Sequence, residues 1–240
     1  MTQSETIWID RRFSGPHGSG NGGYVAGRVA NLLGNGPAEV SLRARVPLET
    51  ALEVKRFGDG AVQLMHGDTL VCEARRAAPS LRPPLPPFDW ALAERLRESG
   101  GGQVGSVFAN CIVCGRDRAV GDGLQCWAER VPGKPGQSLS LYLPHEAHTD
   151  EEGRIRPEFV WGTLDCPGAW AAQDAGEERP ALTGRLTAQI FERPRPGQRC
   201  LVVGWRTGVD GRKLHAGTAL YRDDGTLCAL AQQLWIVLRQ

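Results

Sequence analysis

The sequence predicts an α+β protein in which one structural unit occurs twice. Residues 15–24 and 165–170 each lead, through a glycine- or proline-containing stretch, into an apolar segment of helical character. Runs with alternating apolar residues, which are typical of half-buried strands, follow both segments. Residues 69–76 can be superposed on residues 226–233 by the order of their apolar positions. Since any two antiparallel meanders share some of this pattern, duplication is a hypothesis at this point.

The composition is that of a globular chain without a strong charge bias. Of 240 residues, 41% are apolar, and 28 basic against 27 acidic residues leave a net charge of +1. This balance gives no electrostatic reason to expect a nucleic-acid or membrane partner. No apolar run approaches the roughly 20 residues that span a bilayer. The first residues do not resemble a signal peptide, and seven cysteines at irregular spacing favour free thiols in the cytoplasm.

The first half of the chain reads as a short strand, one helix and four further strands. The helix over residues 24–33 is apolar on nearly every side, so it must be covered on nearly every side, and Gly34 is a natural stop. The strand at residues 40–46 alternates strictly, which predicts one buried face. The remaining predicted strands of this half are residues 7–9, 52–55, 61–65 and 69–76.

A stiff proline-rich connector over residues 79–87 and a short helix over residues 88–99, ending at the glycines 100–102, separate the halves. We therefore predict an N-terminal unit over 1–80, a linker with a short helix over 81–103, and a C-terminal unit over 104–240. The second half is predicted to hold strands at 124–127, 138–143, 182–190, 200–205, 212–221 and 226–237, a polar loop at 145–156 and a helix start at 165–173.

The run Asn21-Gly22-Gly23-Tyr24 before an apolar helix resembles the start of the long helix in hotdog-fold proteins. Two such units in one chain are similar to the double-hotdog acyl-CoA thioesterases, of which the type II enzyme is one. The resemblance implies a double hotdog, with two antiparallel sheets each wrapped around a central helix. Residues 111–115 and 121–124 also look like a motif of thioesterase-like hotdog proteins whose role is unknown.

The resemblance implies a catalytic set of Asp165, Thr183 and Gln233, although counting along the strand from residues 193–194 places Gly184 where Thr183 is expected. It also implies hydrolysis of acyl-CoA or a related acyl thioester, without a cofactor. Asn21, Gly22, Gly23 and Tyr24 are the candidate substrate-binding residues.

Thioester hydrolysis needs a water molecule, a base and donors for the developing oxyanion. Asp165 is the candidate base, Gln233 can orient the same water, and Thr183 can hold the water or the carboxylate. Backbone N–H groups at Gly22 and Gly23 can face the thioester oxygen. Each residue has a structural alternative: a helix cap for Asp165, close helix packing for the glycines, and ordinary strand positions for the other two.

Other chemistries stay open. Cys111 and Cys114 suggest zinc, with Cys126 as a third ligand and His145 or His148 as a fourth, but no second Cys-x-x-Cys follows, so we predict no metal. A hotdog hydratase or dehydratase acting on enoyl thioesters would need a histidine, for which His17 and His215 are the candidates. A non-catalytic acyl-thioester-binding protein is a further alternative. Since one chain is predicted to hold both units, the protein can be a monomer or a homo-oligomer.

Overall fold

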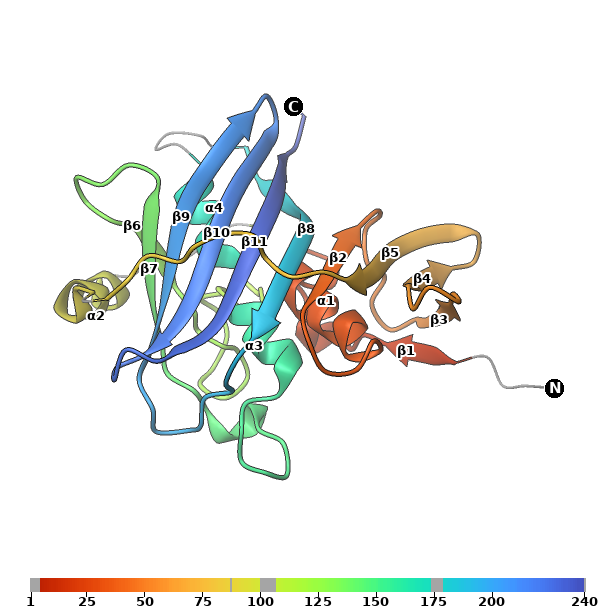
Figure 1. Ribbon diagram of the computed structural model, residues 1–240, viewed down its shortest axis with the longest axis horizontal. Coiled ribbons are helices and arrows are strands. Elements are labelled where there is room, and N and C mark those ends of the chain that lie inside the picture. Colours follow the sequence, from red (N-terminus) through yellow and green to blue (C-terminus); the bar gives the residue numbers. More distant parts are fainter. Residues whose placement is uncertain (1–4, 87, 100–106, 174–178, 240) are drawn as a thin grey trace.

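The computed structural model describes residues 5–86, 88–99, 107–173 and 179–239. Its strands form one antiparallel sheet of eleven strands in the order β1-β3-β4-β5-β2-β8-β11-β10-β9-β7-β6 (Figure 1). The strands of the first half are β1 (Thr6–Trp8), β2 (Ala38–Leu42), β3 (Ala51–Arg56), β4 (Val62–His66) and β5 (Thr69–Arg76). Those of the second half are β6 (Ala128–Arg130), β7 (Gln137–Tyr142), β8 (Ala181–Ile190), β9 (Cys200–Asp210), β10 (Lys213–Arg222) and β11 (Leu227–Val237).

The two halves share this sheet because β2 pairs with β8 as well as with β5. Antiparallel partners across the join include Ala38 with Ala188 and Val40 with Leu186. The expectation of two separate sheets is therefore wrong. Two separate sheets would leave β2 and β8 as open edges with unpaired backbone groups, and pairing them removes both edges. The strand order is also symmetrical about the join, since β5 flanks β2 and β11 flanks β8.

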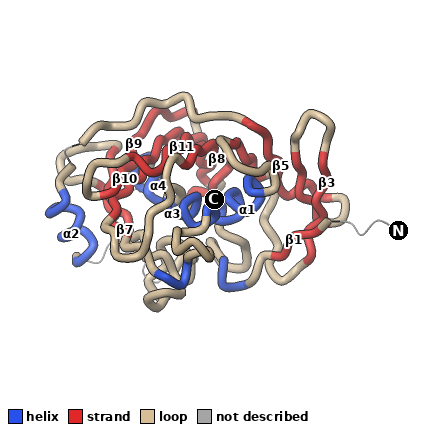
Figure 2. The backbone as a smooth tube through the Cα atoms, turned by 60° about the horizontal axis from the view of Figure 1, so that its bottom comes forward, coloured by secondary structure: helices blue, strands red, loops and turns tan. Residues whose placement is uncertain are grey.

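Three helices lie on one side of the curved sheet, beneath the arch of strands in Figure 2. They are α1 (Gly22–Asn31), α3 (Pro157–Thr163) and α4 (Cys166–Ala172), so the second half has two short helices where one was expected. Helices α1 and α3 pack against each other. Gly27 permits this approach, because a Cβ there would lie 2.6 Å from Glu158 Cα. Helix α4 packs on β9 and β10.

The opposite face of the sheet is crossed by the connector that leads to α2 (Trp90–Glu98) (Figure 1). The Tyr221 hydroxyl donates to the Pro84 carbonyl at 2.6 Å, and the Ser80 hydroxyl donates to Gln232 Oε1 at 3.0 Å. Helix α2 places Ala93 in a second apolar cluster with side chains of β7, β9 and β10. The predicted end of this helix at residues 100–102 lies outside the described residues.

Two predicted strands differ from the structure. Residues 124–127 form no strand, because Gln125 has a φ of 51° and the segment is hydrogen-bonded to a loop: the Leu124 N–H donates to the Ile112 carbonyl at 2.7 Å. The strand expected at 40–46 ends at Leu42, because the N–H groups of Arg43 and Ala44 both donate to the Val71 carbonyl and the regular ladder stops there. Other predicted strands match observed strands in order and approximate position.

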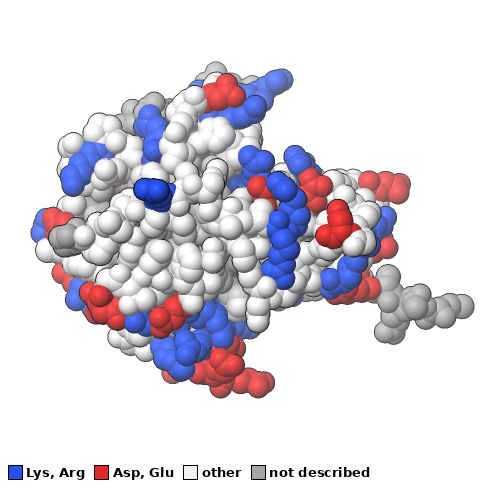
Figure 3. All heavy atoms as spheres, in the orientation of Figure 1, with Lys and Arg blue, Asp and Glu red and all other residues white. Residues whose placement is uncertain are grey.

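Charged groups of both signs are interspersed at the rim of the face shown in Figure 3, around a largely uncharged centre. No single-sign field covers this face. Among the described helices, none has the length and apolar content that a membrane crossing would require.

Candidate functional site

A buried carboxylate lies where the first helix meets the second half of the chain. Asp165, at the start of α4, is 2% exposed. Its side chain makes no capping bond to α4. Instead, Oδ1 accepts the Thr183 hydroxyl at 2.8 Å and Oδ2 accepts Asn21 Nδ2 at 3.0 Å. The backbone N–H of Gly23 also donates to the carboxylate. Groups from the start of α1 and from β8 therefore hold a carboxylate that lies at the start of α4.

Two glycines allow α1 to come this close. A Cβ on Gly23 would lie 2.5 Å from Asp165 Cβ and 2.9 Å from the Trp161 carbonyl oxygen. A Cβ on Gly22 would lie 2.7 Å from Thr183 Oγ1. Asn21 begins the helix, and its Oδ1 accepts the Tyr24 N–H at 2.8 Å while its Nδ2 turns to Asp165. Both glycines thus serve close packing, and Gly23 N–H is occupied by the carboxylate rather than directed at a substrate.

The contact to Thr183 depends on an irregularity in the sheet. Along β8, Arg185 is paired with Leu234 and Thr183 with Trp235, so Gly184 is an extra residue opposite β11. Such a bulge changes which face a side chain points to. Thr183, rather than Gly184, contacts Asp165.

Asp165 lies in the wall of a cavity of about 720 Å³. Both halves of the chain contribute to the lining, which includes Gly22, Leu42, Phe108, Leu182 and Ile236. The lining also contains His17, Arg43 and Arg45, all of them exposed. A largely apolar cavity with one carboxylate in its wall and basic side chains at its outer part has the usual composition of a small-molecule site.

Burial raises the pKa of Asp165 to about 6, against the hydrogen bond from Thr183, which lowers it. The neighbouring Cys111 thiol group adds to the rise, whereas the donors on Gly23 and Asn21 oppose it. Desolvation is the largest effect because the side chain has almost no contact with solvent. A carboxylate with such a pKa is a stronger base than an exposed one.

Gln233 lies on β11 and is buried, but its side chain does not contact the Asp165 carboxylate. Its Nε2 donates to the Leu164 carbonyl, to the Asp165 carbonyl at 3.3 Å and to Thr218 Oγ1 at 3.2 Å. Its Oε1 accepts Trp235 Nε1–H at 2.7 Å. The amide therefore supports the backbone at the start of α4, and it is not among the groups that line the cavity.

Tyr24 also lies away from the cavity. Its ring stacks on Phe13 with centroids 4.1 Å apart, and it is 2% exposed. Of the four predicted substrate-binding residues, Asn21 and Gly22 line the cavity, and Gly23 contacts only its carboxylate. The histidines proposed for lyase chemistry do not bond to Asp165: His17 is exposed, and His215 lies on β10 outside the cavity lining.

A group of thiols lies beside the carboxylate, and sequence reasoning singled out Cys111 and Cys114 without placing Cys166 next to them. Cys111 Sγ accepts Asn21 Nδ2 at 3.6 Å, and both Cys111 and Cys166 line the cavity. Hydrogen bonds from the Cys114 and Cys166 thiols hold the pKa of Cys111 well below its ordinary value. The signals in the sequence were the Cys-x-x-Cys spacing of Cys111 and Cys114 and the position of Cys166 next to Asp165.

No protein-family model matches the sequence, and no curated protein does. Solved structures do match. A protein of unknown function with a hotdog fold from Alicyclobacillus acidocaldarius has a TM-score of 0.57 at 13% identity, over 93% of this chain and 89% of that chain. The tesB protein of Mycobacterium avium subs. paratuberculosis has a TM-score of 0.58 at 12% identity, over 92% and 88%. A candidate thioesterase II from Thermobifida fusca YX has a TM-score of 0.60 at 13% identity, over 98% and 96%.

The chain therefore has the hotdog fold. The likeness extends over nearly the whole of this chain and of the thioesterase-like structures it matches, which confirms at the level of fold the resemblance found in the sequence.

Proposed function

We propose that this protein hydrolyses acyl thioesters, with acyl-CoA as the substrate class, and that Asp165 activates the attacking water. One observation carries the proposal: a buried carboxylate, held by Thr183, Asn21 and Gly23, lies in the wall of a cavity of about 720 Å³. The similarity in fold to thioesterase-like structures supports the same class of reaction.

In the proposed mechanism, Asp165 accepts a proton from water as the water oxygen attacks the thioester carbonyl carbon. The carbon–sulfur bond then breaks, and the leaving thiolate recovers the proton from Asp165. Gly22 is the proposed oxyanion donor, because it lines the cavity and is the first residue of α1, where N–H groups have no partner within the helix. Thr183 and Asn21 position the carboxylate, and Gln233 supports the backbone behind it.

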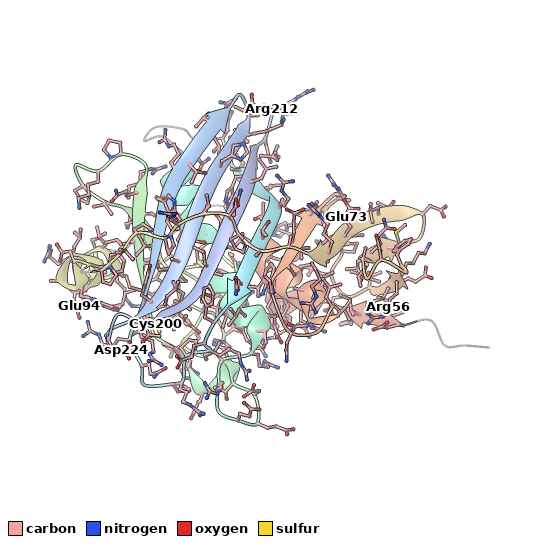
Figure 4. The ribbon with its side chains drawn as sticks, in the orientation of Figure 1. Arg56, Glu73, Glu94, Cys200, Arg212 and Asp224 are labelled. Atoms are coloured by element: carbon pink, nitrogen blue, oxygen red, sulfur yellow. The ribbon has the colours of Figure 1, made fainter. Side chains whose placement is uncertain are left out.

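The apolar lining would hold the acyl chain, and the basic residues at its outer part would meet the phosphates of a carrier such as CoA. Arg43 is paired with Glu73, which Figure 4 labels on β5, and Arg45 donates to the His17 carbonyl. Both guanidinium groups are exposed and can also donate hydrogen bonds to a phosphate. In this proposal, two hotdog units over 1–80 and 104–240, joined by a linker over 81–103, together build the site.

The test is release of free thiol from acyl-CoA substrates of graded chain length. We expect hydrolysis by the wild type and a loss of about 100-fold or more in kcat for Asp165→Asn, since removal of a general base typically has an effect of this order. Asp68→Asn, in the exposed turn between β4 and β5, is the matched control and should retain full activity. Full activity in Asp165→Asn would refute the mechanism. Hydration of an enoyl-CoA without thiol release would identify a lyase, and binding without turnover an acyl-binding protein.

A further inference from the structure

Three thiols converge beside the carboxylate, and hydrolysis uses none of them. The Sγ atoms of Cys111, Cys114 and Cys166 all lie within 4.8 Å of one another. Cys111 and Cys114 come from the loop before β6 and are 1% and 3% exposed, while Cys166 is the first residue of α4. Two segments more than 50 residues apart in the sequence thus bring three soft ligand atoms close together.

The loop that carries the first two thiols is a tight turn. The Gly115 N–H donates to the Cys111 carbonyl at 2.9 Å, and the backbone N–H groups of Val113 and Cys114 donate to Cys111 Sγ. A Cβ at Gly115 would lie 2.4 Å from the Ala109 carbonyl oxygen, so a side chain there would disrupt the turn. These backbone contacts fix the position of the Cys111 Sγ atom.

We propose that Cys111, Cys114 and Cys166 bind one Zn²⁺ ion as three thiolate ligands, with the fourth coordination position facing the cavity. With Zn–S bonds of about 2.3 Å, tetrahedral geometry places sulfurs roughly 3.8 Å apart, so the thiols need to approach by no more than about 1 Å. Three thiolates select zinc over magnesium or calcium, which prefer oxygen ligands.

The surroundings meet two further requirements of a metal site. Asn21 Nδ2 donates to Cys111 Sγ at 3.6 Å and to Asp165 Oδ2 at 3.0 Å, and such outer contacts orient metal ligands. Cys111 and Cys166 line the cavity, which provides a path for the ion. The ion would tie the loop around Cys111 to the start of α4, one residue from Asp165. The zinc site is inferred from the positions of the three thiols, and it does not depend on whether the protein hydrolyses thioesters.

The ligand set differs from the one considered from sequence. Cys126 Sγ lies 3.1 Å from Ser140 Oγ and donates to the Thr163 carbonyl at 3.6 Å, and it is not part of the cluster. His148 packs against Phe159, with ring centroids 4.6 Å apart. Cys166 takes the place of the third ligand.

The experiment measures zinc in the full chain after phosphine reduction, anaerobic loading and removal of free metal. We expect about one zinc ion per chain in the wild type, and less than about a tenth of that in Cys111→Ser and Cys166→Ser. Cys200→Ser is the control and should bind as the wild type does. This cysteine is also buried, but it lies at the start of β9 near Asp224 (Figure 4) and outside the cluster.

A second readout separates ligation from loss of fold. Co²⁺ bound by thiolates gives intense charge-transfer absorption, which should appear in the wild type and in Cys200→Ser. Far-UV circular dichroism of the two cluster variants should remain that of the wild type. Failure of the reduced wild type to take up zinc, or undiminished zinc in either cluster variant, would overturn the proposal. Neither result depends on thioesterase activity.

Discussion

Gly23 shows how much of the site depends on the absence of one side chain. A Cβ at this position would meet both Asp165 Cβ and the Trp161 carbonyl oxygen, neither of which is the end of a flexible side chain. We expect Gly23→Ala to lower the free energy of unfolding by about 1–3 kcal/mol, as overpacking of a close contact usually does. Thiol release should fall as well, because α1 must move away from the carboxylate.

The measurement for Gly23→Ala is urea unfolding, with Gly58→Ala as the control. Gly58 lies in the exposed turn between β3 and β4, and a Cβ there would meet nothing within 4 Å. Equal midpoints for the two variants would contradict the close packing of α1 on Asp165.

His148 makes the stability of the fold depend on pH. It is fully buried, and burial lowers its pKa to about 4, with further lowering from His145, Arg12 and Arg156. Between about pH 4 and the ordinary histidine pKa of about 6.5, the unfolded chain binds a proton that the folded chain does not. The contribution of His148 to the free energy of unfolding, roughly 3 kcal/mol, should therefore be lost as pH falls through this window, whereas the raised pKa of Asp165 acts in the opposite direction.

The pH effect is measured as the free energy of unfolding of the wild type and His148→Leu at several pH values. The variant should lose this part of the slope between about pH 4 and 6.5. His66→Asn, at the exposed end of β4, should retain it. An unchanged slope in His148→Leu would show that other groups cause the acid sensitivity.

At the scale of a single element, Asn21 has two separable tasks at the start of α1. Its oxygen caps the helix and its amide nitrogen holds Asp165. Asn21→Ser keeps a capping oxygen but loses the amide, whereas Asn21→Ala loses both. We expect Asn21→Ala to be about 1 kcal/mol less stable than Asn21→Ser. Both variants should lose thioesterase activity to a similar extent, since neither has the Nδ2 group that donates to Asp165 Oδ2.

Thermal or urea unfolding and thiol release, measured on the same two preparations, test this separation. If Asn21→Ser kept wild-type turnover, the Nδ2 contact to Asp165 would have no part in the reaction.

The bulge at Gly184 is a second feature of a single element, because it decides that Thr183 points at Asp165. Side chains alternate between the two faces of a strand, so counting along β8 should show which residue faces Asp165. Because the bulge adds one residue to β8, the count does not decide between Thr183 and Gly184.

At the scale of the whole molecule, the pairing of β2 with β8 joins both halves into one sheet. Separation of the halves would expose two central strands and the apolar contact between α1 and α3. We therefore expect one cooperative unfolding transition for the full chain.

The check uses two probes during urea unfolding: tryptophan fluorescence and the reactivity of the buried Cys72 on β5. Cys72 reports the first half, whereas five of the seven tryptophans lie beyond residue 100 and report mainly the second. Coincident midpoints support one folding unit, and two separated transitions would contradict it.

The sequence by itself determined the repeat of elements, the apolar helix after Asn21 and the place of Asp165 at a helix start. These follow from local rules: alternation of apolar residues in strands, glycine and proline at boundaries, and caps at helix ends. The same rules misplaced the end of β2 and assigned a strand at 124–127, where contacts with a distant loop dominate.

Only the tertiary structure decided which groups surround Asp165. Gln233 is directed at the backbone and Tyr24 at the core, while Asn21, Gly23 and Thr183 reach the carboxylate. The thiols of Cys111 and Cys166 meet for the same reason. Contacts between residues far apart in the chain depend on how strands pair and how closely helices approach, and neither is encoded in the spacing of residues along one segment.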